Sequence, residues 1–201
     1  MSKFLFAFAM SILFVIPALT AQEKSIQTIE RIPTSIDEFN SYRVKASTTP
    51  EGGAAVFVTA MLMYSQDEIL GMQAFTMILD KSKLVENSTS PIYDKLSPSP
   101  ATYEEIKQYF GKHKDYLANA YIVGTSPSNA YMLPAAPYQV ELNRNASSVQ
   151  ADGTVRLFIS TTGADIPRPI VLKQNSRGLW KVVSYNALFV NVRLGDNINK
   201  M

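Results

Sequence analysis

The hydrophobic pattern contains an almost wholly apolar run from Ala54 to Tyr64, which is the most prominent feature of the chain. A helix that is apolar on all sides lies in the interior of a domain, so this run predicts a central buried helix. Thr49 can cap the N-terminus of this helix with its hydroxyl group. Pro50 suits the first helical position, because the amide hydrogen that proline lacks has no helical acceptor there. The helix is therefore expected to begin at residue 50.

Further helices are predicted on both sides of the apolar run. The capping-box pattern, in which a serine or threonine stands three positions before a glutamate, marks helix starts. It predicts a short helix over residues 35–45, a helix beginning at Ser65 and a helix beginning near Pro100. Gly111 is expected to end the last of these, because glycine readily adopts the left-handed conformation of a helix C-terminus, and the alternative is a further turn through Lys114. Residues 86–101 are rich in Ser and Pro and are expected to form a loop.

The second half of the chain shows the two-residue period of β-strands. Tyr138, Val140 and Leu142 alternate with polar residues, and hydrophobic residues alternate again over residues 155–159. Shorter strands are expected at residues 121–123, 131–133, 170–172, 179–184 and 188–193, with a hairpin loop at 175–178. Helices followed by consecutive strands predict an α+β fold, with N-terminal helices packed on a curved, mostly antiparallel C-terminal sheet.

The N-terminal residues have the layout of a secretory signal peptide. Lys3 precedes an apolar segment that ends near Leu19, and Ala21 offers a small residue before a polar stretch. The alternative is a retained membrane anchor, but the apolar segment is shorter than the about 20 residues that a spanning helix needs. Cleavage after Ala21 predicts an exported protein, periplasmic or secreted, with no stable membrane span. The expected organisation is a signal peptide at residues 1–21, a spacer at 22–34, a single domain at 35–195 and a tail at 196–201.

Composition excludes several classes of function. The chain has no Cys, which excludes disulfides, thiolate chemistry and zinc sites built from cysteine. His113 is the only histidine and is expected to be a solvated surface residue between two lysines. A metal site with two histidines cannot form within one chain, and we expect neither a metal nor another cofactor. The 19 Lys and Arg residues nearly balance the 17 Asp and Glu residues without a clustered basic run, so nucleic acid is not an expected partner.

Three segments of the chain carry a resemblance to a known family. They are Thr-Pro-Glu-Gly-Gly-Ala at residues 49–54, Tyr-Ile-Val-Gly-Thr-Ser-Pro-Ser-Asn at 121–129 and Thr-Gly-Ala-Asp-Ile-Pro-Arg-Pro-Ile at 162–170. Together they resemble a family of bacterial proteins described only as a domain of unknown function, over roughly residues 35–195. The resemblance implies an exported or accessory domain and supplies no catalytic residues. The order of elements also resembles that of the NTF2-like and cystatin-like folds, which host many functions.

Five residues are candidates for ligand binding, namely Tyr121, Ser126, Asn129, Arg168 and Trp180. The hydroxyl groups and backbone amides of residues 124–129 can bind an anion or a peptide carboxylate, although a turn explains the same composition. Arg168 can either meet an acidic ligand in a cavity or form an ion pair with Asp165. Aromatic residues can also line a concave face of the sheet, and the candidates for this role are Tyr121, Tyr131, Tyr138 and Trp180.

The leading hypothesis is a non-enzymatic exported domain that binds an unknown small ligand, a peptide or another envelope protein. One alternative is a small-pocket enzyme of NTF2-like type that uses a buried carboxylate or tyrosine. Glu141 and Asp165 are the carboxylates of the strand region, whereas Glu104 and Glu105 are explained by the dipole of a first helical turn. Another alternative is a structural subunit of an envelope assembly, for which a large exposed hydrophobic patch would be the sign.

Overall fold

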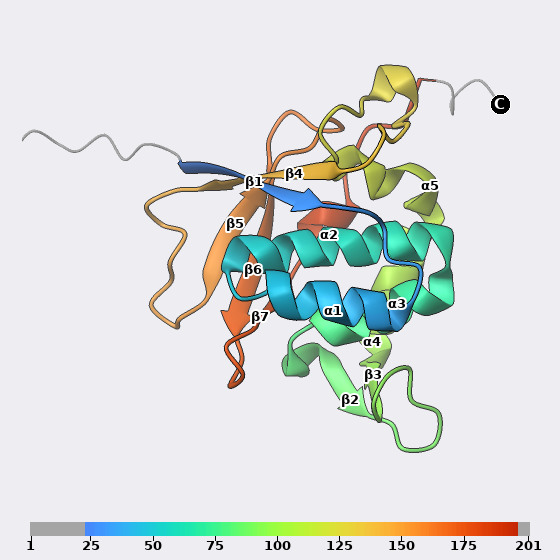
Figure 1. Ribbon diagram of the computed structural model, residues 1–201, viewed down its shortest axis with the longest axis vertical. Coiled ribbons are helices and arrows are strands. Elements are labelled where there is room, and N and C mark those ends of the chain that lie inside the picture. The colour runs from blue at the N-terminus through green and yellow to red at the C-terminus, as the bar shows by residue number, and fades with distance from the viewer. Residues whose placement is uncertain (1–22, 197–201) are drawn as a thin grey trace, which may run out of the picture.

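The computed structural model describes residues 23–196 and shows helices packed on a curved antiparallel sheet (Figure 1). The large sheet has the strand order β1-β4-β5-β6-β7, and every neighbouring pair is antiparallel. Its strands are β1 (Glu23–Ile29), β4 (Tyr138–Arg144), β5 (Val155–Ile159), β6 (Arg168–Gln174) and β7 (Trp180–Ser184). The expected α+β fold class is therefore confirmed. The expected signal peptide lies outside the described residues, as does all of the expected tail except Asp196.

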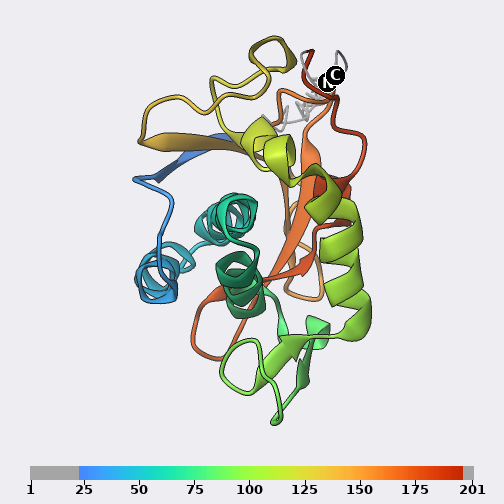
Figure 2. The ribbon, with the colours of Figure 1, turned by 90° about the vertical axis from the view of Figure 1, so that its right-hand side faces the viewer.

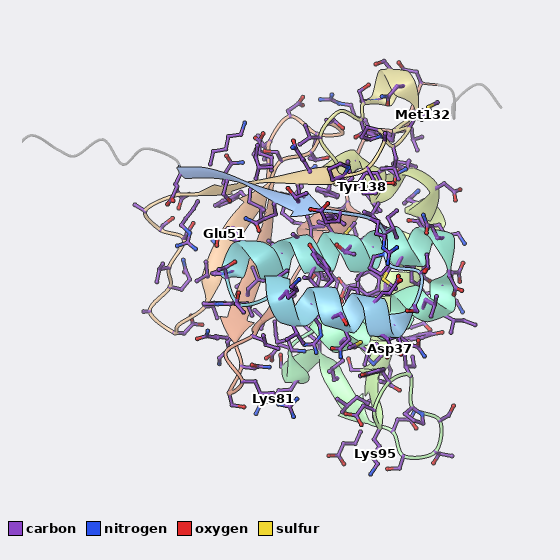
Figure 3. All side chains as sticks on the ribbon, viewed as in Figure 1. Asp37, Glu51, Lys81, Lys95, Met132 and Tyr138 are labelled. Carbon is purple, nitrogen blue, oxygen red and sulfur yellow. The ribbon has the colours of Figure 1, made fainter. Side chains whose placement is uncertain are left out.

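Helices α2 (Pro50–Gln66) and α3 (Glu68–Ile78) contact the sheet, and α1 (Ile36–Ala46) packs against both of these helices. Figure 2 shows them nearly end-on, next to the curved sheet. Asp37 and Glu51 lie near the N-terminal ends of α1 and α2 and are at opposite sides of Figure 3, so these two helices run antiparallel. Because α2 contacts α1, α3 and strands β4 to β7, it forms the centre of the domain.

Helix α2 is the buried helix that the apolar run predicts. Every residue from Gly52 to Tyr64 is buried, and the Thr49 hydroxyl accepts a hydrogen bond from the Gly52 amide at 3.1 Å. Gly53 faces the sheet, where a Cβ atom would lie 2.8 Å from Leu172 Cδ2 and 3.0 Å from Trp180 Cβ. The missing side chain at Gly53 therefore lets α2 approach strands β6 and β7 closely.

The expected spacer at residues 22–34 is wrong for its first part. Residues 23–29 form β1, which pairs with β4 along its whole length and closes one edge of the sheet. The burial alternates as in a strand, but Ser25 and Gln27 occupy the partly buried positions while Ile26 is 51% exposed. The strand was missed because polar residues face inward, so its backbone hydrogen bonds to β4 define it rather than an apolar face.

Three of the expected short strands are also wrong. Tyr121 ends a 3₁₀ turn, η4 (Asn119–Tyr121), and residues 131–133 lie in a turn after the 3₁₀ turn η5 (Pro127–Asn129). The segment expected as a strand at 188–193 begins inside a further 3₁₀ turn, η6 (Asn186–Phe189). A hydrophobic run of three to six residues is too short to show a period. The sequence therefore could not distinguish a buried turn from a strand in these segments.

The helical region after residue 100 begins at Pro100, as the sequence predicted, but continues past its predicted end. The expected loop at 86–101 contains part of a small hairpin, formed by β2 (Leu84–Glu86) and β3 (Leu96–Pro98). Helix α4 (Pro100–Glu105) then continues past Gly111 through a π-helical turn, η2 (Ile106–Phe110), and a 3₁₀ turn, η3 (Gly111–His113), into α5 (Lys114–Leu117). Gly111 does not end the helix because its φ of −57° is that of an ordinary helical residue.

The sequence also placed the start of α3 incorrectly. Asp67 rather than Ser65 caps α3, and its carboxylate accepts hydrogen bonds from the amides of Ile69 and Leu70. Ser65 lies inside α2, and its hydroxyl donates to the Lys114 carbonyl at 2.7 Å. The Ser65 hydroxyl is therefore engaged with α5 and does not cap α3. This hydrogen bond joins α2 to α5.

Candidate functional site

The five residues proposed from the sequence do not gather at one place. Arg168 is the first residue of β6, whereas Trp180 pairs with Gln174 at the other end of that strand. Seven residues of strand span about 20 Å, so a small ligand cannot contact both side chains. Tyr121 is buried, and its hydroxyl donates to the Leu188 carbonyl at 2.7 Å.

The polar atoms of the Ser126 to Asn129 segment bond to one another. The Ser126 amide donates to Asn129 Oδ1 at 2.8 Å, and the Asn129 amide donates to Ser126 Oγ at 3.3 Å. This reciprocal cap of η5 agrees with the turn that was the alternative interpretation of the segment. Arg168 donates to the Asn191 carbonyl at 2.8 Å, while Asp165 forms its ion pair with Arg193. These contacts assign the candidate residues structural roles in the loops around η5 and η6.

The structure instead shows a groove of about 360 Å³ on the outer side of the helices, which we call the α3–α4 groove. It lies between the last residues of α2, one side of α3, the β2–β3 loop and the α4–η2 helix. Its lining consists of Tyr64, Glu68, Ile69, Met72, Gln73, Pro91, Ile92, Tyr103 and Lys107. The groove was missed because these residues are spread over more than forty positions of sequence and share no local motif.

The inner part of the α3–α4 groove is apolar and aromatic. Tyr64 and Met72 are buried in it, and burial raises the pKa of Tyr64 to about 12. Ile92 and Tyr103 are partly buried at its sides, and Ile69 is an apolar residue that remains 75% exposed. This surface can hold the apolar part of a ligand through burial of hydrophobic area.

Two charges of opposite sign lie at the edge of the α3–α4 groove. Glu68 is neutralised by an ion pair with Lys114, with 2.5 Å between the carboxylate and the ammonium. Lys107 lies over the Tyr103 ring, 6.0 Å from its centroid, and forms no ion pair among the described residues. The groove therefore combines an apolar interior with one cation that lacks an acidic partner.

A second groove of about 440 Å³ lies on the other side of the same helical segment, and we call it the histidine groove. It is lined by Gln108, Tyr109, Lys112, His113, Tyr116, Leu117, Phe189, Val190, Asn191 and Val192. His113 is exposed, as the sequence predicted, and its ring lies 5.7 Å from that of Tyr116. More of the surface of this groove is polar than in the α3–α4 groove, so it is less suited to an apolar ligand.

The carboxylate best placed for acid–base chemistry is one that the sequence analysis assigned to a helix dipole. Glu105 Oε2 accepts a hydrogen bond from the Tyr185 hydroxyl at 3.2 Å. Burial raises the pKa of Glu105, and burial also raises the pKa of Tyr185. Neither residue lines the grooves described above, and Tyr185 is buried whereas Glu105 is partly exposed.

The carboxylates that the sequence proposed for this chemistry are engaged elsewhere. Glu141 binds Lys24 at 2.5 Å and accepts from the Ser160 hydroxyl at 2.8 Å, and the Lys24 contact holds the pKa of Glu141 below its usual value. Asp165 is exposed and is paired with Arg193. No group of three His, Asp or Glu residues within positions 23–196 is arranged to hold a metal ion. No helix in this same range is long and apolar enough to cross a bilayer.

The fold and the grooves together define an α+β domain whose helices carry open surface grooves, among them the two described above. Comparison with family models matches residues 31–195 to the family described as Domain of unknown function (DUF6935), and the chain belongs to this family. The resemblance to a family described only as a domain of unknown function is thus confirmed. No curated protein matches the chain. No solved structure matches it either, so the similarity to NTF2-like folds stays a prediction.

Proposed function

We propose that this protein is an exported, non-enzymatic binding domain whose α3–α4 groove holds a small ligand with an apolar body and one acidic group. The observation that carries this proposal is the combination of apolar and aromatic side chains with the ammonium of Lys107, which forms no ion pair with residues 23–196. Ligand sites typically have volumes of about 300–1,000 Å³ and a few polar groups that fix orientation. The groove, at about 360 Å³, falls at the lower end of this range and suits a small molecule.

The charges of the groove favour an acidic ligand over a basic one. The carboxylate of Glu68 already has Lys114 as its partner, whereas Lys107 has only the face of Tyr103. An anionic group placed at the edge of the groove would give Lys107 an ion pair, while a cationic group would meet like charge. The apolar part of the ligand would then lie against Met72 and Ile92.

Export is the second part of the proposal and depends on the N-terminal sequence. Lys3, the apolar segment after it and Ala21 form the layout of a signal peptide, and the chain contains no Cys. The proposed location is therefore the periplasm or the medium. Mass measurement of the purified native protein tests this directly, because cleavage predicts an N-terminus at Gln22 and a retained Met1 would contradict it.

Enzymatic activity is the second candidate function, and the Glu105–Tyr185 contact is the observation that favours it. A carboxyl group with a raised pKa beside a tyrosine is a typical acid–base arrangement. However, Tyr185 is fully buried and neither residue lines the two grooves, so a substrate could reach the Tyr185 hydroxyl only after a movement of the surrounding helices, although Glu105 itself is partly exposed. Binding in the α3–α4 groove needs no such movement, and we favour it for this reason.

A fluorescence titration with anilinonaphthalene sulfonate tests the binding proposal, since this probe has an apolar aromatic body and one negative charge. We expect saturable binding to the folded protein at one site. Tyr103→Ala should weaken binding about tenfold, because the loss of a tyrosine side chain that packs on a ligand can cost more than about 1 kcal/mol. Lys107→Gln should weaken it about twofold to fivefold, as expected for an exposed ion pair.

Lys112→Gln is the matched control, because Lys112 lies in the histidine groove on the other side of the same helical segment. It removes the same charge and should leave the affinity for the probe unchanged. Equal losses for Lys107→Gln and Lys112→Gln would mean that the probe reports net charge rather than this groove. Absence of saturable binding to the wild-type protein would exclude the proposed site.

A further inference from the structure

A second feature, separate from the α3–α4 groove, lies where the C-terminal end of α1, the β6–β7 turn and β7 meet (lower left of Figure 1). The Trp180 amide donates to the Ser47 carbonyl at 2.7 Å, which attaches the end of α1 to the start of β7. The Asp80 amide donates to the Val182 carbonyl at 2.9 Å, which attaches the end of α3 to the same strand. Two helix C-termini and one hairpin turn therefore converge here.

Three cationic residues belong to the three elements that meet here, and we call them the basic corner. Arg43 belongs to the last turn of α1, Arg177 to the β6–β7 turn and Lys181 to β7. The Lys181 ammonium donates to the Met77 carbonyl near the end of α3. Burial and the neighbouring charges of Arg43 and Arg177 lower the pKa of Lys181 to about 8, in agreement with the backbone contacts that bring the three elements together.

The negative charge at this corner does not balance the positive charge. Among residues 23–196, Arg43, Arg177 and Lys181 take part in no ion pair. Asp80 is the nearby carboxylate, but the Ser82 amide also donates to it at 2.9 Å. The C-terminal ends of α1 and α3 each contribute roughly half a negative charge. About two negative charges thus face three positive ones, and Lys173, opposite Lys181 in the β6–β7 ladder, adds a fourth.

The Arg43 guanidinium also has N–H donors that bond to no described residue. Its guanidinium donates to Asn40 Oδ1 at 2.6 Å, and this is its single hydrogen bond to the described residues. The Nε atom of Arg43 and the Oγ atom of Ser47, one helical turn later, are both buried without a partner. A helix C-terminus explains one lysine at this place, because Lys181 binds a terminal carbonyl, but it does not explain Arg177 in the exposed turn.

We propose that the basic corner of Arg43, Arg177 and Lys181 binds the phosphate group of a ligand, either a phosphorylated solute or the headgroup of an anionic lipid. Arginine presents several N–H donors in a planar fork that matches the oxygen atoms of phosphate. A bound phosphate would supply the negative charge that the corner lacks and would offer Arg43 and Arg177 acceptors. The site lies on the β6–β7 hairpin and does not depend on the α3–α4 groove.

Intrinsic fluorescence offers a direct test, because Trp180 is the only tryptophan and adjoins Lys181. The full chain is titrated with inorganic phosphate, with sodium chloride keeping the ionic strength constant. We expect a saturable change in Trp180 emission, with affinity about tenfold weaker in Arg177→Gln. Arg177 is exposed, and its backbone amide rather than its side chain bonds Asn175, so this variant should fold normally.

Arg156→Gln is the matched control, since Arg156 is an exposed arginine on β5 and its loss changes the net charge equally. A second arm measures flotation with vesicles of phosphatidylglycerol against vesicles of phosphatidylcholine. Phosphate binding that needs Arg177 supports a soluble ligand, and vesicle binding that needs Arg177 supports a lipid headgroup. The proposal is overturned if neither probe binds, or if Arg177→Gln and Arg156→Gln reduce binding to the same extent.

Discussion

The α2–α3 hairpin and the segments around the grooves are held in place by different forces. In α2 and α3 the buried surface is almost entirely apolar, and Phe57, Phe75 and Tyr64 pack ring against ring. Residues 119–131 and 186–193 depend more on hydrogen bonds to distant parts of the chain, two of which run from tyrosine hydroxyls to carbonyls, while Leu188 and Phe189 also join the core. Tyr121 binds Leu188, and Tyr131 binds Arg193 at 2.6 Å.

The difference separates the apolar α2–α3 hairpin, which also lines one side of the α3–α4 groove, from the hydrogen-bonded segments beside the histidine groove. Apolar packing is spread over many contacts, so the loss of one contact is shared among its neighbours. A turn held by one buried hydrogen bond depends on that bond, and such regions open locally at lower free energy than the core. The histidine groove lies partly on the second kind of region, because Phe189 to Val192 form one of its sides.

Substitution of Gly71 in α3 should give the largest loss of stability among the changes that test this difference between the two regions. A Cβ atom at Gly71 would overlap the backbone of Tyr64, so α2 and α3 could not keep their close approach. We expect Gly71→Ala to lower the free energy of unfolding by about 3 kcal/mol or more, as an overpacked core with a shifted backbone does. Urea denaturation followed by circular dichroism measures the change.

Gly111→Ala is the control for Gly71→Ala in the irregular helical segment. A Cβ atom at Gly111 would lie 3.3 Å from the Tyr64 hydroxyl, which is the end of a side chain that can move. The backbone there is helical, where Ala is preferred over Gly, so the stability should change by less than about 1 kcal/mol. If Gly111→Ala lowered the free energy of unfolding as much as Gly71→Ala, the two regions would be equally sensitive to an added methyl group.

The sequence predicted the first region well and the second poorly, for a physical reason. The run from Ala54 to Tyr64 and the alternation of Tyr138, Val140 and Leu142 encode burial locally, so each pattern identifies its element. Tyr121 is buried because its hydroxyl meets the Leu188 carbonyl, 67 positions later, and no local period records such a contact. The predicted turn at residues 124–129 could be recognised because its caps involve neighbours in sequence.

The same reasoning explains why the candidate site could not be predicted. The lining of the α3–α4 groove comes from four separate segments, and its members are common core or surface residues when taken one at a time. Glu105 was assigned to a helix dipole because nothing near it in sequence indicates Tyr185, 80 positions away. Only the packing of α4 against η6 and the end of β7 brings them together.

Tyr121→Phe tests the hydrogen bond that fixes the second region. Removing the buried hydroxyl leaves the Leu188 carbonyl without its donor, which typically costs about 1–3 kcal/mol. Hydrogen exchange should show faster opening of residues 186–193, with little change in α2 and α3. Tyr109→Phe is the control, because Tyr109 is 55% exposed and its hydroxyl has no partner among the described residues. Uniform loss of protection across the whole domain in Tyr121→Phe would contradict a local role for this bond.

The smallest expected effect concerns Glu105 and appears as a dependence on pH. Burial raises the pKa of Glu105 above its ordinary value of 4.5, so the folded protein keeps this proton at pH values where the unfolded chain has lost it. The free energy of unfolding should therefore decrease as pH rises from about 4.5 through the raised pKa. Glu105→Gln removes the titrating group while its amide oxygen can still accept the Tyr185 hydroxyl.

Thermal unfolding at several pH values between 4 and 8 measures this contribution. The stability of Glu105→Gln should fall less with rising pH than that of the wild type. At neutral pH this variant should be slightly more stable than the wild type, since it buries no charge. Glu104→Gln removes the same charge at the adjacent exposed position and should keep the wild-type slope. If Glu105→Gln also kept the wild-type dependence of stability on pH, the Glu105 carboxylate would be fully solvated in the folded protein. The hydrogen bond between Glu105 and Tyr185 would then not join α4 to the end of β7.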